Sequence, residues 1–192
     1  MNRKVWLFIV CLYIVTVSSC RTTKAPVQHV TFPPEVRLSQ IEAREMANLA
    51  QEISVEIGMP VTQEDNLLLY AFIADWRNVP YRYGSVGKRG TDCSGFVMSL
   101  YEAVYQIPIG RMSAASLMDK TVPIERAELK EGDLVFFNIN NRTGGRASHV
   151  GVYLRNDLFV HAATKTGITI SSLSERYYSR TYLGAGRIRE RT

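Results

Sequence analysis

The first hydrophobic segment of the chain lies near its N-terminal end. Arg3 and Lys4 precede an apolar run from Val5 to Val17, which is interrupted only by Thr16. These 13 residues are too few for a transmembrane helix, which needs about 20. A basic start followed by a short apolar segment is typical of a secretory signal. We therefore expect residues 1–19 to be a signal peptide.

Two helices are predicted between residues 36 and 76. In Val36–Ile57 hydrophobic residues recur at roughly helical spacing, and the pattern stops before Gly58 and Pro60. These positions are Leu38, Ile41, Met46, Leu49, Ile53 and Ile57. The second segment, Asn66–Trp76, is dense enough in apolar residues to indicate burial. The preceding residues 20–35 are polar and contain prolines, which favours an extended tether.

A third helix is predicted to begin near Cys93. The segment Thr91–Tyr101 offers Thr91 or Asp92 as the residue that caps the helix N-terminus. Positions 93, 96, 97, 100 and 104 are apolar and fall on one face of such a helix. The thiol is therefore expected at a helix start, on the side that faces the core.

The remainder of the chain predicts a sheet. After the turn Glu131–Asp133, short apolar runs bounded by polar residues and glycines indicate strands. The predicted strands are Leu134–Phe137, His149–Leu154, Leu158–Ala162, Gly167–Ser171 and Leu183–Ile188. A helical half followed by a mostly antiparallel sheet is an α+β fold.

Composition bounds the class of protein. A chain of 192 residues with 46% hydrophobic and 21% charged residues has room for one water-soluble domain and a short appendage. Loss of Arg3 and Lys4 with the signal leaves 21 basic and 18 acidic residues, a net charge of +3. The basic residues are scattered, so nucleic-acid binding is not expected.

The cysteines single out one residue of the folded part. Cys11 lies in the signal and Cys20 directly follows it, so Cys93 is the one thiol left in the mature domain. A free thiol in an oxidising compartment is a liability unless it is used. The dipole and unpaired N–H groups of a helix start lower a thiol pKa, so we expect Cys93 to be a nucleophile with a lowered pKa. The alternative is a small buried hydrophobic residue.

Two histidines accompany that thiol, since His29 falls in the tether. His149 and His161 flank a predicted hairpin. With its turn centred on Arg155, they would lie directly opposite on one face, with Cβ atoms about 5 Å apart. A register shifted by one residue would separate them. A thiol nucleophile needs a base and a group that orients the base, so we assign His149 as base and His161 as orienter. Either could instead be an ordinary core or surface histidine.

Five segments in order resemble the NlpC/P60 family of cell-wall endopeptidases. They are Tyr81–Gly84, Gly90–Val97, Gly132–Phe137, His149–Tyr153 and Phe159–Ala162, and the resemblance covers roughly Glu64 to Arg189. It implies a papain-like α+β fold and a Cys-His-His triad. The substrate implied is the peptide stem of peptidoglycan, commonly cut between D-glutamate and a diamino acid. The domains expected are the tether, a helical extension over 36–62 and a catalytic domain over 63–192.

Roles carried over by position follow from this resemblance. Cys93 matches the nucleophile, His149 the base and His161 the third member. Tyr81 matches a tyrosine near the oxyanion site, where a donor is worth about 3 kcal/mol; it could instead only pack beside Pro80.

Two further residues match substrate-holding positions of the family. Asp92 and Ser94 match positions that hold the polar end of the stem peptide. Asp92 could instead be only a helix cap, and Ser94 only a first-turn residue. Ser85 replaces a second glycine found in many relatives, which puts the loop shape near the substrate in question.

The end of the signal adds an expectation about location. Val17-Ser18-Ser19-Cys20 resembles a bacterial lipobox, which implies that Cys20 is lipidated and becomes the mature N-terminus. A plain signal with an incidental cysteine is the alternative. We expect a monomer anchored by lipid in the cell envelope, periplasmic or associated with the outer membrane. Its partners would be the membrane and peptidoglycan stem peptides. No metal-ligand spacing, phosphate loop or dinucleotide fingerprint is present, so no cofactor is expected.

Three functions remain open at this point. The first is hydrolysis through a Cys93 thioester, and the second is acyl transfer on the same fold. The third is a binding lipoprotein without catalysis, which would not need all three triad positions. The helix over 36–57 is expected to pack on the back of the domain; covering the cleft is the alternative.

Overall fold

The computed structural model describes residues 34–139 and 144–188. The predicted signal peptide, the lipobox with Cys20, and His29 lie outside these residues. The chain divides into two units, Met1–Arg37 and Leu38–Thr192, and nearly all described residues belong to the second. Within the described ranges, no helix combines the length and apolar character needed to cross a bilayer.

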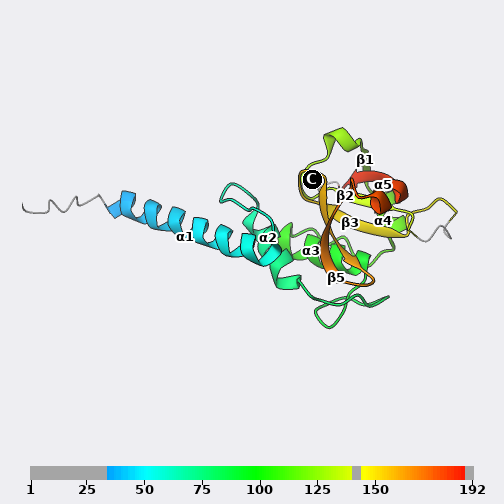
Figure 1. Cartoon of the computed structure of the whole chain (residues 1–192), viewed down its shortest axis with the longest axis horizontal. Helices are drawn as coiled ribbons and strands as arrows, with labels where there is room; N and C mark the ends of the chain where they lie inside the picture. The colour runs from blue at the N-terminus through cyan, green and yellow to red at the C-terminus, as the bar shows by residue number, and fades with distance from the viewer. Residues whose placement is uncertain (1–33, 140–143, 189–192) are drawn as a thin grey trace, which may run out of the picture. The chain divides into compact units, whose positions relative to one another are not determined.

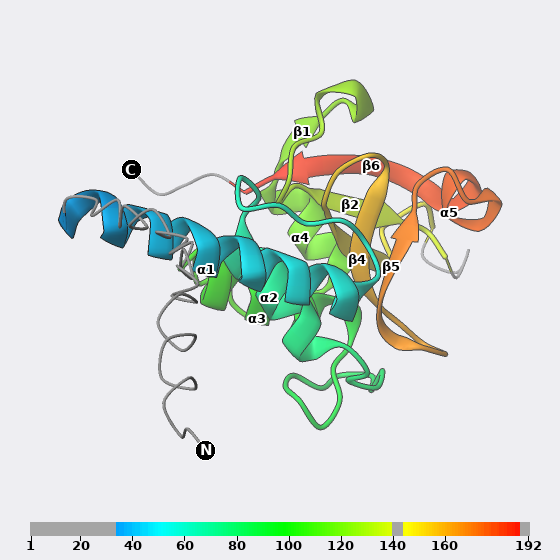
Figure 2. The same cartoon turned by 60° about the vertical axis from the view of Figure 1, so that its left-hand side comes forward.

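Three helices follow one another in the first half, as predicted. α1 spans Pro34–Ile57, α2 spans Leu67–Trp76 with Asn66 as its N-cap, and α3 spans Cys93–Val104. Figures 1 and 2 show the three grouped together beside the sheet. Their buried side chains share one hydrophobic cluster with the sheet, which includes Ile53 of α1, Ile73 of α2 and Phe96 of α3.

A six-stranded sheet forms the second half, with every strand pair antiparallel. The strands are β1 (Val122–Ile124), β2 (Leu134–Phe137), β3 (His149–Tyr153), β4 (Leu158–Ala163), β5 (Gly167–Ser172) and β6 (Tyr182–Arg187). Their spatial order is β1-β6-β2-β3-β4-β5. The predicted α+β class is confirmed, and five of these strands were predicted to within one residue at each end.

Alternation along the strands produces two different faces. One face carries Val150 and Val160 and packs against the helices. The other carries Phe137 and Phe159, and the side chain of Tyr178 from a short helix covers it. That helix, α5 (Arg176–Thr181), leads into β6 and is visible beside the sheet in Figure 2.

Four short elements were not predicted: α4 (Ala114–Lys120), β1, the 3₁₀ turn η1 (Arg126–Glu128) and α5. Each is seven residues or shorter, so hydrophobic periodicity has too few repeats to register. α4 does carry a local signal, because the Ser113 hydroxyl accepts from the Ser116 N–H as an N-cap should.

The hairpin between β3 and β4 differs from its predicted register. Val152 pairs with Val160, so the turn is centred one residue later than Arg155. Asn156 and Asp157 hold φ of 50° and 62°, which identifies a tight turn of the kind that Asn and Asp tolerate. The prediction that the two histidines are directly opposite is therefore wrong. They are diagonal neighbours that still share a face.

Candidate active site

Cys93 is the first residue of α3. The Asp92 carboxylate accepts from the Gly95 N–H at 2.7 Å and caps the helix, so the predicted helix start is confirmed. The thiol side chain is buried, with 8% of the residue exposed.

Burial dominates the electrostatics of the thiol. It raises the pKa of Cys93 to about 11, although backbone N–H groups, first that of Val150, act in the opposite direction. The prediction of a lowered pKa is wrong, because desolvation of the thiolate outweighs the helix start. In the resting protein Cys93 is therefore a neutral thiol that needs a base.

His149 and His161 lie together on the face that carries Phe137 and Phe159. Nε2 of His149 is 2.9 Å from Nδ1 of His161, and the ring planes are perpendicular with centroids 4.9 Å apart. Both residues are buried, with 4% and 1% exposed. The predicted pair is thus formed, by diagonal rather than direct opposition.

Both imidazoles are neutral near pH 7. Burial lowers the pKa of His149 to about 4. Burial, and then the adjacent His149, lower the pKa of His161 well below its ordinary value. A neutral imidazole can accept a proton, which is the first requirement for a general base.

Two hydroxyl groups complete the surroundings of His161. Its Nε2 lies 3.2 Å from Oγ of Ser171 and 3.1 Å from Oη of Tyr178. Neither residue was found from the sequence. Ser171 lies at the end of a predicted strand and Tyr178 in an unpredicted helix, so only their proximity in the fold reveals them.

The Asp92 carboxylate is occupied by partners within the protein. Besides the helix cap, it accepts from the Gly84 N–H at 2.9 Å and from the Ser94 hydroxyl at 3.2 Å, and it forms an ion pair with Arg111. Burial acts to raise the pKa of Asp92, but the hydrogen bonds from Arg111, Gly95 and Gly84 outweigh it and the pKa is lowered.

Arg111 is a cationic residue of the site that the sequence analysis did not identify. Its Nη1 donates to the Ser94 hydroxyl at 2.6 Å, and its side chain remains 38% exposed. Asp92 is therefore a helix cap and an anchor for this guanidinium at once. The predicted helix cap is confirmed, and contact of Asp92 with substrate stays a prediction.

The loop before α3 is held close to the helix. The Ser85 carbonyl accepts from the Asp92 N–H at 3.1 Å. A Cβ on Gly95 would lie 2.5 Å from that carbonyl oxygen, so only glycine fits there. With Ser85 in place of a second glycine, the loop still keeps the Gly84 hydrogen bond to Asp92.

Cys93 and the histidines open into two adjacent cavities. One, of about 670 Å³, is lined by Cys93, Asp92, Ser94, Arg111 and Arg146 among others. The other, of about 160 Å³, is lined by His149 and His161. Tyr81, Tyr83 and Ser148 line both cavities, so the two lie side by side. Together they form the candidate cleft.

Tyr81 stands where the two cavities meet. Burial raises the pKa of Tyr81 to about 12, with further contributions from Cys93 and Asp92. The phenol therefore stays protonated at neutral pH and can donate a hydrogen bond. This position allows the predicted oxyanion role. Tyr81 is also partly buried and packs against the main hydrophobic cluster, so both roles stay predictions.

The described side-chain hydrogen bonds include none between Cys93 and His149. Catalytic hydrogen bonds are often long or poorly aligned until substrate binds. Nε2 of His149 is engaged by His161, so Nδ1 is the ring nitrogen left to receive a proton. The arrangement provides a buried thiol, a neutral base whose Nδ1 is not the nitrogen bound to His161, and a cleft that reaches both.

Comparisons with known proteins identify the family. The model of the NlpC/P60 family matches residues 78–187. A probable endopeptidase NlpC homolog of Haemophilus influenzae is 45% identical over 114 residues, which are 59% of this chain and 58% of that protein. Murein DD-endopeptidase MepS/murein LD-carboxypeptidase of Escherichia coli is 39% identical over 119 residues, 62% of this chain and 61% of that protein.

A solved structure matches the fold as well. A protein of the NLP/P60 family from Staphylococcus aureus, described as similar to lipoprotein, superposes with a TM-score of 0.59 at 28% identity. The match covers 66% of this chain and 42% of that one. The chain thus spans about three fifths of each of the two curated relatives and less than half of this structure.

Proposed function

The chain belongs to the NlpC/P60 family, and from that membership we propose that it is a cysteine peptidase that hydrolyses amide bonds in the peptide stems of bacterial peptidoglycan. The observation that carries the proposal is the pairing of two buried neutral histidines at 2.9 Å beside a cleft that Cys93 lines. A protein that only binds wall peptide has no need for this arrangement.

The reaction begins with proton transfer from the Cys93 thiol to Nδ1 of His149. The sulfur attacks the substrate carbonyl carbon, and the oxyanion that forms is stabilised by the Cys93 N–H and the Tyr81 hydroxyl. The C–N bond then breaks, and the leaving amine takes the proton from His149. A thioester remains on Cys93.

Water completes the cycle. His149 takes a proton from the attacking water, and the thioester C–S bond breaks to release the acid. The proton returns to sulfur. His161 keeps the His149 ring oriented through both steps, which is the role of the third member in such triads.

The larger cavity supplies the contacts for the acyl part of the substrate. Ser94 and Arg111 present polar groups there, with Asp92 holding the guanidinium in place. An exposed guanidinium recognises carboxylates through paired hydrogen bonds. Peptidoglycan stems carry carboxylates close to their scissile bonds, so this cavity fits that class of substrate.

The bond we propose first is the one between D-glutamate and the diamino acid. The name of the Escherichia coli relative gives a second candidate, because it is called a DD-endopeptidase and an LD-carboxypeptidase. On that analogy the chain would cut the D,D cross-link or the terminal L,D bond instead. Products identified by mass separate the three.

We also propose that the protein is a lipid-anchored envelope monomer. The proposal rests on the signal-like start and on the small residues before Cys20. The Staphylococcus aureus family member is itself described as similar to lipoprotein. Metabolic labelling with a fatty-acid probe, with Cys20→Ala as control, should label only the unchanged chain.

The reaction is tested with purified protein and its Cys93→Ala variant. Both are incubated with stem peptides that contain the three candidate bonds, and products are read by mass with and without an added amine. We expect cleavage by the unchanged protein only, and no amine adduct. An adduct would instead establish acyl transfer, and peptide binding without turnover would establish a binding protein.

A further inference from the structure

The outer nitrogen of His161 is held by two hydroxyl groups from different elements. Ser171 comes from β5, the strand next to the His161 strand, where His161 pairs with Thr169. Ser171 is two residues further along and so shares the face of His161. Tyr178 comes from α5 and meets the His161 ring edge-on, with centroids 5.3 Å apart. Both hydroxyls therefore reach Nε2 from fixed positions.

The direction of hydrogen bonding through the histidines decides whether His149 can act as a base. If Nδ1 of His149 is to accept the thiol proton, its own proton must be on Nε2. That proton is then donated to Nδ1 of His161 across 2.9 Å. The His161 proton must in turn be on Nε2, and it needs an acceptor there.

The opposite direction gives an inactive arrangement. If a hydroxyl donates to Nε2 of His161, the His161 proton is on Nδ1 and is donated to Nε2 of His149. The His149 proton is then on Nδ1, where it blocks transfer from Cys93. A neutral imidazole has one donor and one acceptor nitrogen, so the two arrangements exclude each other.

We propose that Ser171 and Tyr178 are positioning residues that accept a hydrogen bond from the Nε2–H of His161 and thereby select the tautomer in which His149 can take the thiol proton. The inference rests on the proposed function and deepens it. Neither residue touches the reacting atoms, and both act through His161.

The surroundings support acceptance at this point. Tyr178 and Ser171 also share a side-chain hydrogen bond that acts to lower the pKa of Tyr178, as a hydroxyl that donates to the phenol oxygen does. A phenol oxygen can accept more than one hydrogen bond, so it can accept from Ser171 and from the Nε2–H of His161 together. Burial raises the pKa of Tyr178, so the phenol keeps its proton at neutral pH. The ring is fixed by Phe137 and Phe159, with centroids at 5.5 Å and 4.9 Å.

Nitrogen-15 spectra of the imidazole rings test the tautomer directly, without substrate. The unchanged full-length protein should show His161 protonated at Nε2 and bare at Nδ1. In the double variant Ser171→Ala/Tyr178→Phe we expect the Nδ1–H form to become populated. A double variant with unchanged ring signals, or an unchanged protein with His161 protonated at Nδ1, overturns the inference.

Kinetics give the second readout. The double variant should lose roughly 10- to 100-fold in kcat with KM nearly unchanged, the size of loss typical when the hydrogen-bond partner that orients a metal-bound histidine is removed. The single variants should lose less, since either hydroxyl can accept alone. Ser171→Thr, which keeps the hydroxyl, should restore the rate in combination with Tyr178→Phe. A change in KM with kcat unaltered, or no rescue by threonine, contradicts the positioning role.

Matched controls come from the same cluster. Among the described residues, the buried Tyr182 hydroxyl has no hydrogen-bond partner, so Tyr182→Phe should leave kcat and tautomer unchanged. Ser172→Ala is a second control with the same expected result, because it removes a hydroxyl next to Ser171 in the sequence but on the other face of β5. If the unchanged protein cuts no stem peptide while its spectra show the expected tautomer, the proposed function fails and the inference stands.

Discussion

At the scale of single residues, burial and the helix start act on Cys93 in opposite directions. The capped start of α3 favours the thiolate, but the pKa of Cys93 lies near 11 because the site is desolvated. Burial also holds the pKa of His149 near 4. The resting pair is therefore a thiol and an imidazole, not a thiolate and an imidazolium, and Cys93 needs a base to take its proton.

This gives a prediction for chemical modification. Below its pKa, the thiolate fraction of a thiol rises about tenfold per pH unit. The rate of Cys93 alkylation by iodoacetamide should therefore keep rising up to about pH 11, beyond the point where an ordinary cysteine peptide levels off. The Cys93→Ala variant gives the background at each pH. A rate that is constant from about pH 5 to 8 would indicate a preformed ion pair and contradict the assignment.

At the scale of elements, the approach of β3 to β4 sets the position of His161. A Cβ on Gly151 would lie 2.6 Å from Cδ2 of Phe159 and 3.3 Å from Cβ of His161. We expect Gly151→Ala to lower the free energy of unfolding by roughly 1–3 kcal/mol. It should also reduce kcat, because β4 must shift. Thermal unfolding and steady-state kinetics measure the two effects.

Gly186→Ala is the matched control for this prediction. It would crowd Thr121 in the same way, at the β6 side of the sheet, without touching a histidine. Its folded fraction should keep full kcat at a similar cost in stability. Equal kcat losses in the two variants would show that general loosening of the sheet, rather than placement of His161, causes the effect.

The strand pattern shows which parts of the site local sequence can predict. The positions of Cys93, His149 and His161 at a helix start and on two strands were predicted because each lies in a segment with a clear period. Their shared face survived an error in the turn, since moving its centre by one residue changes the cross-strand partner by two and preserves the face. The Asn156-Asp157 pair carried the signal for the true turn.

Other parts of the site depend on tertiary proximity. Arg111 is 17 residues along the chain from Ser94 and 19 from Asp92. Ser171 is 10 residues from His161, and Tyr178 is 17 residues from it. Nothing in their local sequence indicates those partners. The thiol pKa was wrongly predicted for a related reason, because desolvation is set by the packed core around α3 rather than by its first turn.

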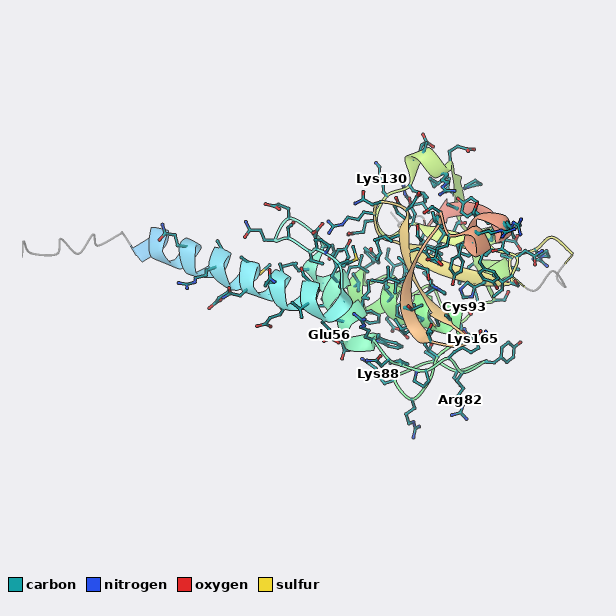
Figure 3. The ribbon with its side chains drawn as sticks, in the orientation of Figure 1. Glu56, Arg82, Lys88, Cys93, Lys130 and Lys165 are labelled. Carbon is teal, nitrogen blue, oxygen red and sulfur yellow. The ribbon has the colours of Figure 1, made fainter. Side chains whose placement is uncertain are left out.

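At the scale of the whole molecule, α1 divides into an exposed part and a packed part. Residues 42–49 are exposed, whereas Ala50, Ile53 and Ile57 are buried in the main cluster. Arg77, just after α2, donates to the Glu56 carbonyl. In Figure 3, Glu56 lies well away from Cys93. Within the described residues, neither cavity of the cleft is lined by α1, which favours packing on the back of the domain over covering the cleft.

Ile53→Ala tests that conclusion. Ile53 is 5% exposed, and loss of such a side chain to alanine costs roughly 2–5 kcal/mol. The free energy of unfolding should fall by that amount, while kcat and KM per folded molecule stay unchanged. Val55→Ala, at 75% exposure, should alter stability by less than about 0.5 kcal/mol. A changed KM with unchanged stability in the Ile53 variant would mean that α1 communicates with the cleft. Because the buried side chains of α1 belong to the main hydrophobic cluster and line neither cavity of the cleft, its packing should instead act on activity only through the fraction of molecules that are folded.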